Sequence, residues 1–330
     1  MDPLPPDPWL NGLSIVVVLG SVTAWVWIIW KWRTSGYVLQ FEPRRRAPWG
    51  AGAALPALVF VLLAVMQAFA PAAAEHDEHI RNGQAIASRI AAMLLLQLFF
   101  SGGLFVVVAL IYRAMAQDFG LPRFGREALR DVAIGIVACF AAFIPVGAAQ
   151  EFLQRLMGRE DGLSQHQLIQ MITGAGAIDA WVMLLACLSA VIVAPICEEI
   201  AFRLLFQGWL EKREDEVVRN DPDGGPDQWT IQAWNSTLED TTNPLLMNGP
   251  GRRGLAGLPY GWMPILASSV LFGLAHAGYG PEPVPLFLFA LLLGYVYQRT
   301  NRILPCIVAH GLFNAVTMLA LWRMILQGAD

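Results

Sequence analysis

Two adjacent carboxylates, Glu198 and Glu199, interrupt an apolar run that is long enough to span a membrane. Arg203 follows Glu199 by four residues, so the two side chains share a helix face in the order that favours an ion pair. Glu198 points about 100° away around the helix and lacks this partner. Carboxylates at bilayer depth are costly and usually functional, and a partly desolvated carboxylate suits general-base catalysis. A purely structural ion-pair cluster would explain Glu199 and Arg203 but not Glu198.

Two later apolar segments each carry a histidine with a partner four residues away. Phe272 and His276 share a helix face, where the ring can orient the imidazole. His310 and Asn314 have the same spacing and could donate hydrogen bonds to one oxygen, as stabilisation of a tetrahedral oxyanion requires. Each pair alone is weak evidence, because histidine and asparagine also join membrane helices by hydrogen bonds. All three groups fall at comparable depths from one membrane face, so they could line one cavity.

Composition places these residues in a membrane protein. The 330-residue chain is 56% hydrophobic and 15% charged, whereas soluble domains carry about 25% charged residues. We expect an all-α fold, a polytopic transmembrane bundle of about eight helices, because about 20 apolar residues span a bilayer. The candidate helices are 11–30, 51–71, 90–112, 132–149, 180–209, 261–278, 284–298 and 303–323.

Charge distribution predicts the orientation. Basic residues gather in the first, third and seventh loops, whereas the second loop is acidic. By the positive-inside rule, these odd-numbered loops are cytoplasmic and both termini lie outside an inner or plasma membrane. The active site would then lie toward the cytoplasmic half. The net charge of −4 offers no basic face for nucleic acid.

One polar segment stands apart from the helices. Residues 211–258 carry a net negative charge and are rich in Asp, Gly and Pro, a composition that favours a flexible cytoplasmic insertion. We therefore divide the chain into N-terminal transmembrane helices over 1–128 and a second unit over 129–325 that this insertion interrupts.

The three motifs together resemble those of the CPBP intramembrane proteases, which include type II CaaX prenyl proteases and bacteriocin-processing or immunity proteins. They read Glu-Glu-x-x-x-Arg at 198–203, Phe-x-x-x-His at 272–276 and His-x-x-x-Asn at 310–314. The flanks Ser268-Ser-Val-Leu-Phe and Arg299-Thr-Asn-Arg-Ile-Leu-Pro also match. The resemblance covers about residues 130–320, and the insertion at 211–258 departs from the usual pattern.

The resemblance implies an endopeptidase acting on a peptide or lipidated, CaaX-like protein substrate at the bilayer. Glu198 would activate the attacking water with help from His276. His310 and Asn314 would stabilise the oxyanion, and three residues would support the site: Glu199, Arg203 and Phe272. The family is often labelled as metalloproteases, and Glu198, His276 and His310 could bind Zn²⁺ with a fourth position for water. A metal-bound Glu198 leaves no obvious base unless Glu199 serves, so we favour a metal-independent mechanism and keep zinc as the alternative.

Other functions are less consistent with the sequence. A non-enzymatic scaffold or bacteriocin-immunity protein that binds a peptide or lipid remains the main alternative, although all three motifs are intact. Inverted repeats would favour a transporter, and the sequence shows none. Cys306 and His310 are also four residues apart, but a buried apolar cysteine is usually inert.

Overall fold

The computed structural model describes residues 8–42, 47–68, 83–114, 116–122, 125–158, 180–220, 255–258, 261–277 and 282–328. All regular elements within these ranges are helices, so the fold is an all-α bundle, as predicted. Each of the eight predicted segments contains a helix. The main helices are α1 (Pro8–Ser35), α2 (Leu55–Ala68), α3 (Gly83–Ile111), α4 (Arg126–Leu156), α6 (Ala180–Cys187) with its continuation, α10 (Trp262–Leu274), α11 (Pro283–Thr300) and α12 (Leu304–Gly328).

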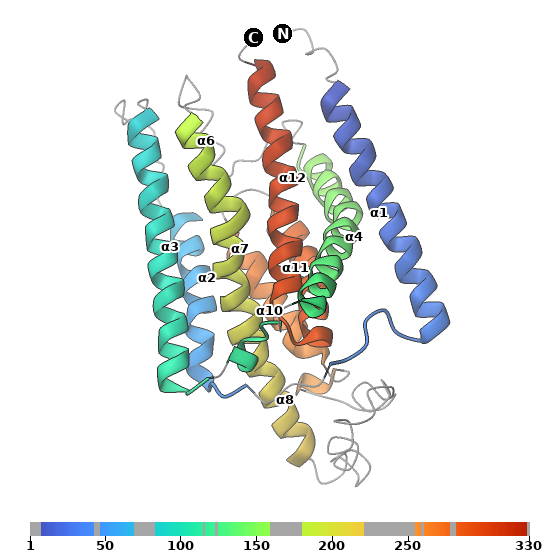
Figure 1. Ribbon diagram of the computed structural model, residues 1–330, viewed down its shortest axis with the longest axis vertical. Coiled ribbons are helices and arrows are strands. Elements are labelled where there is room, and N and C mark those ends of the chain that lie inside the picture. The colour runs from blue at the N-terminus through green and yellow to red at the C-terminus, as the bar shows by residue number, and fades with distance from the viewer. Residues whose placement is uncertain are drawn as a thin grey trace.

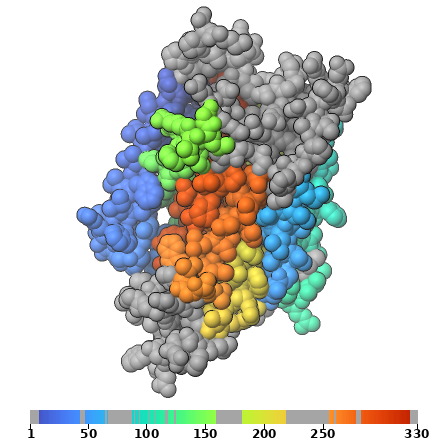
Figure 2. All heavy atoms as spheres, turned by 180° about the vertical axis from the view of Figure 1, so that it is seen from behind, coloured from blue at the N-terminus to red at the C-terminus, as the bar shows by residue number. Residues whose placement is uncertain are grey.

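Within the described ranges, five helical segments are long and apolar enough to cross a membrane. They are Pro8–Ser35, Ile90–Ile111, Arg126–Leu156, Trp181–Val217 and Leu304–Arg323. α10 has only 13 residues, about 20 Å of helix, which is shorter than the roughly 30 Å hydrocarbon core. α10 and α11 pack against each other, and Figure 2 shows that they reach the surface between α1 and α2.

The fifth predicted span is one long helix that contains two π-helical segments. α6 continues into a π-helix, η4 (Leu188–Val193), then α7 (Ala194–Glu199), a second π-helix, η5 (Ile200–Gln207), and α8 (Gly208–Asn220). The Ala194 N–H donates to the Ser189 carbonyl, five residues back. π-Helical turns inside α-helices are frequent at functional sites, and here they flank the two glutamates.

α8 corrects one expectation about the polar insertion. Residues 211–220 are helical rather than loop, because they include good helix formers and an ion pair between Arg213 and Glu216. Residues 221–254 of the predicted insertion lie outside the described residues, and Leu255–Gly257 form a short 3-10 helix.

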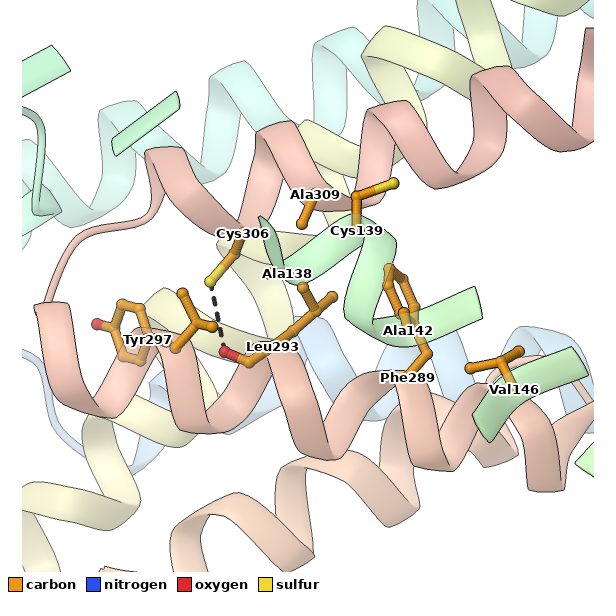
Figure 3. Packing of buried hydrophobic residues seen from close by; sticks show 10 residues of the cluster. Ala138, Cys139, Ala142, Val146, Phe289, Leu293, Tyr297, Cys306 and Ala309 are labelled. Carbon is orange, nitrogen blue, oxygen red and sulfur yellow. Dashed lines mark hydrogen bonds between the residues drawn. The ribbon is translucent and has the colours of Figure 1, made fainter. Parts of the chain in front are cut away.

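Helices α4, α11 and α12 form the centre of the bundle. Their shared core includes Ala138, Phe289, Leu293, Tyr297 and Cys306 (Figure 3). α4 approaches α12 closely at Gly135, where a Cβ atom would lie 2.7 Å from the Val308 Cβ.

α1 lies at the outside of the bundle, packed mainly against α4 (Figure 1). One contact between them is polar: the Trp25 indole N–H donates to the Ala141 carbonyl over 3.0 Å. Pro145 lies four residues after Ala141 inside α4 and has no N–H to offer that carbonyl. A side chain of a neighbouring helix thus satisfies the backbone group that proline leaves free, as the bilayer requires.

Successive connections between the helices lie alternately at one end of the bundle and at the other. α1 begins and α12 ends at the same end (Figure 1). The opposite end carries the connection after α1, the one after α3, and the turn between α11 and α12. The predicted basic loops therefore share one end of the molecule.

Candidate active site

Three elements from distant parts of the sequence bring the predicted residues together. α7 carries Glu198 and Glu199, and Arg203 follows in η5. α12 carries His310. His276 lies in the turn directly after α10, because that helix ends at Leu274. The helix thus ends before His276, but the rings of Phe272 and His276 still contact each other as predicted, with centroids 5.0 Å apart.

Glu198 lies between the two histidines. Its Oε2 atom is 3.9 Å from the Nε2 atom of His276 and 3.9 Å from the Nε2 atom of His310. Both separations exceed hydrogen-bond length, and contacts of this size are commonly bridged by water. The Glu198 side chain is 15% exposed, whereas that of Glu199 is 0% exposed. Glu198 is thus the less buried member of the pair, and its Oε2 atom is buried without a hydrogen-bond partner among the described residues.

The other nitrogen of each imidazole is held by the protein. His276 Nδ1 lies 2.9 Å from the Phe272 carbonyl oxygen. His310 Nδ1 lies 2.8 Å from Glu199 Oε1. A carbonyl oxygen only accepts hydrogen bonds, so the Nδ1 atom of His276 is the donor, and an ionised Glu199 would make the Nδ1 atom of His310 a donor as well. Both Nε2 atoms are therefore the ones presented to Glu198.

Glu199 is part of a buried chain of polar side chains behind the histidines. Its Oε2 atom lies 3.2 Å from the Nε atom of Arg203. Arg203 Nη1 donates to the Ser268 hydroxyl over 3.0 Å, and that hydroxyl donates to the Phe202 carbonyl over 2.8 Å. Glu199, Arg203 and Ser268 are all 0% exposed. In the sequence, Ser268 stood out only as a neighbour of the Phe-x-x-x-His motif. A polar serine at the same bilayer depth as Arg203 was the one signal that could have suggested this contact.

Aromatic rings enclose this polar chain. The guanidinium of Arg203 lies over the Phe272 ring, 4.9 Å from its centroid. Phe272 and Phe289 meet the His310 ring edge-on, with centroids 5.6 and 5.4 Å away. Both phenylalanines are buried, so they restrict the imidazole and exclude water from one side. Phe289 was not predictable as a site residue, because a phenylalanine in an apolar helix carries no distinguishing pattern.

Asn314 makes a backbone contact. Its Nδ2 atom donates to the Ala190 carbonyl in η4 over 2.8 Å. The amide nitrogen carries two hydrogens, so this bond engages one of them.

A zinc ion does not fit the observed spacing of the candidate ligands. Two ligands of one tetrahedral Zn²⁺ lie about 3.4 Å apart, because each binds at about 2.0–2.2 Å. The Glu198 oxygen is 3.9 Å from each histidine nitrogen. No group of three or more His, Cys, Asp or Glu side chains in the described ranges is arranged to hold a metal ion.

Cys306 bonds to the backbone of α11. Its Sγ atom donates to the Leu293 carbonyl over 3.4 Å, within the core of α4, α11 and α12 (Figure 3). His310 instead contacts Glu199. The arrangement therefore offers no Cys–His nucleophile at this position.

Residues 245–316 match the family model for the type II CAAX prenyl endopeptidases described as Rce1-like. The matched range contains Phe272, His276, His310 and Asn314 but not the two glutamates, which join the site through the fold. The match spans 72 of the 330 residues, so it is a likeness to these prenyl endopeptidases over that part of the chain. No curated protein and no solved structure matches the chain.

Proposed function

We propose that this chain is an intramembrane endopeptidase of the CPBP family in which Glu198 activates the water that attacks a peptide bond. The observation that carries the proposal is the convergence of Glu198 Oε2 with two imidazole Nε2 atoms, each 3.9 Å away. A water molecule at about 2.8 Å from each atom would fit this spacing. Held between a carboxylate and two imidazoles, such a water would lose its proton as it attacks the carbonyl carbon.

Charge balance supports the assignment of roles. Glu198 and Glu199 supply two negative charges, and Arg203 supplies one positive charge. A second positive charge would make the cluster neutral, and burial strongly favours neutral clusters. His310 is the best placed histidine to carry it, because its Nδ1 donates to Glu199. His276 then stays neutral, and its Nε2 atom can accept a hydrogen bond from the water while Glu198 takes the proton.

A protonated His310 suits the oxyanion role. Its Nε2 would donate a hydrogen bond to the oxygen that becomes negative in the tetrahedral intermediate. The second amide hydrogen of Asn314 would be the other donor. Phe272 holds His276 through its carbonyl and Arg203 through its ring, while Glu199 and Arg203 keep His310 oriented.

The substrate in this proposal is a membrane-associated peptide. The glutamates lie within a helical segment that is long and apolar enough to cross a membrane, so the scissile bond must reach the site from within or beside the bilayer. A lipidated, CaaX-like tail fits this requirement, because a lipid chain holds a peptide at the membrane surface. We place both termini outside an inner or plasma membrane and the site toward the cytoplasmic half.

The test is cleavage of a quenched fluorescent CaaX-type lipopeptide by the full chain purified in detergent. We expect Glu198→Ala to lower kcat by about 100-fold or more, because a general base contributes about that much. Ser269→Ala is the control, since Ser269 is fully buried and its hydroxyl has no hydrogen-bond partner among the described residues. If Glu198→Ala cleaves as fast as the wild type, the proposed role of Glu198 is wrong.

The lipid requirement has a separate test with the same enzyme. The identical peptide without its lipid should be cleaved with a much higher KM in lipid nanodiscs, where the lipid concentrates the substrate at the membrane. Equal kcat/KM for the two peptides would refute the proposed substrate class while leaving the catalytic roles intact. Tight binding of the lipopeptide without any cleavage would favour a scaffold.

A further inference from the structure

Pro195 lies inside the helix that carries the glutamates, three residues before Glu198. The preceding residue, Ala194, still follows the π-helical pattern and bonds to the carbonyl five residues back. In that pattern the next N–H would belong to residue 195 and would bond to the Ala190 carbonyl. Proline has no N–H, so the helix cannot satisfy this carbonyl from position 195.

α12 faces the helix at this point with an amide and a glycine. The Asn314 amide donates to the Ala190 carbonyl over 2.8 Å. Three residues earlier, Gly311 approaches the Val191 carbonyl, where a Cβ atom would lie only 2.7 Å from the oxygen. Val191 is four residues before Pro195, the α-helical partner position. Asn314 and Gly311 therefore face the two carbonyls that an N–H at position 195 could otherwise reach.

We infer that Asn314 is a positioning residue that supplies the hydrogen bond missing at Pro195, and that Gly311 allows the close approach this bond needs. An unsatisfied carbonyl is costly in the bilayer, so the bond favours one placement of α12 against the glutamate helix. Trp25 does the same for the carbonyl that Pro145 leaves free in α4. The chain thus uses neighbouring side chains at two internal prolines.

The contact between Asn314 and Ala190 lies close to the residues of the proposed chemistry. His310 lies one residue before Gly311 and one turn before Asn314 on α12. Ala190 and Glu199 belong to the same continuous helix. α12 is thus fastened to that helix at Asn314–Ala190 and at His310–Glu199. A shift of α12 at the first contact would move the His310 Nε2 atom relative to Glu198.

A double-mutant cycle tests this role, with Asn314→Ala and Pro195→Ala made singly and together in the full chain. Asn314→Ala should lower the Tm by several degrees and lower kcat by about 100-fold, a loss that a displacement of about 1 Å can cause. Adding Pro195→Ala restores an N–H beside the freed carbonyls. The double variant should therefore recover most of the lost Tm and about tenfold or more of the lost kcat.

The cycle separates positioning from oxyanion stabilisation. If Asn314 acts only on the oxyanion, restoring an N–H at position 195 changes neither the Tm nor the rate of Asn314→Ala. That result would overturn the inference. The Tm measurement needs no substrate, so it still decides the question if the proposed protease activity is absent. The effect on kcat rests on the proposed function.

Two further variants guard the test against trivial outcomes. Thr317→Val is the matched control, because Thr317 lies one turn after Asn314 and its exposed hydroxyl bonds only within α12. It should leave Tm and kcat unchanged. Gly311→Ala should lower both, because its new methyl group would push α12 away from the Val191 carbonyl. Wild-type Tm and kcat in Gly311→Ala would contradict the close approach.

Discussion

The ion pair between Glu199 and Arg203 gives the sharpest prediction about the supporting residues. Both side chains are 0% exposed, and the contact spans 3.2 Å. Glu199→Gln would leave the Arg203 guanidinium buried without a carboxylate partner. Breaking a buried pair by removing one partner costs about 3–5 kcal/mol. We expect Glu199→Gln and Arg203→Met each to lower the free energy of unfolding by about this amount.

The double variant should behave differently from the sum of its parts. Glu199→Gln with Arg203→Met removes both charges, and neutral replacements of a buried pair are often tolerated. Two independent losses would add to about 6–10 kcal/mol. If the two residues are coupled, the double variant should be at least as stable as the less stable of the two single variants. The coupling energy would then exceed about 3 kcal/mol.

The assay is unfolding in mixed micelles with rising denaturing detergent, compared for the wild type, the two single variants and the double variant. Glu151 and Arg155 provide a control pair with the same spacing on α4, exposed by 64% and 78%. Neutralising that pair in the same way should change stability by about 1 kcal/mol or less. Strictly additive losses for Glu199 and Arg203 would refute our reading of the buried pair.

Two further pairs of variants test the packing behind the site. Ser268→Ala removes the hydrogen bond to the guanidinium, which should cost about 1.5–3 kcal/mol of stability and lower kcat, whereas Ser269→Ala should change neither quantity. Gly135→Ala places a methyl group 2.7 Å from the Val308 Cβ and should cost about 1–3 kcal/mol by overpacking. Gly147→Ala in the same helix meets no atom within 4 Å and should be neutral or stabilising by up to about 1 kcal/mol; thermal unfolding of all four proteins decides both comparisons.

The helical architecture was largely predictable from composition. Apolar runs of bilayer length are a strong signal, because the backbone in a membrane must bond within its own helix. The predicted segment 303–323 became Leu304–Gly328, and 284–298 became Pro283–Thr300. Basic loops indicated which connections share one end of the bundle. The predicted start of the polar insertion, residue 211, lies inside α8, which continues to Asn220, because charged residues alone do not distinguish a loop from an exposed helix.

The local geometry of the site was less predictable. The spacing of Glu199 and Arg203 predicted a shared face, and the ion pair is present. The two π-helical segments have no sequence pattern of their own, since they depend on tertiary contacts such as Asn314 with Ala190. His276 lies outside α10 because that helix ends two residues earlier. No capping residue in the sequence predicted this end. The contact of Ser268 with Arg203 required the fold to bring two helices together.

The central claim is that Glu198 itself activates the water, without a metal ion. The most direct measurement is the single-turnover rate of lipopeptide cleavage by wild type and by Glu198→Gln, each before and after dialysis against a strong chelator. We predict that wild type keeps its full rate after dialysis, and that Glu198→Gln is slower by about 100-fold or more under both conditions. Loss of the wild-type rate after dialysis, with recovery on addition of Zn²⁺, would contradict the account.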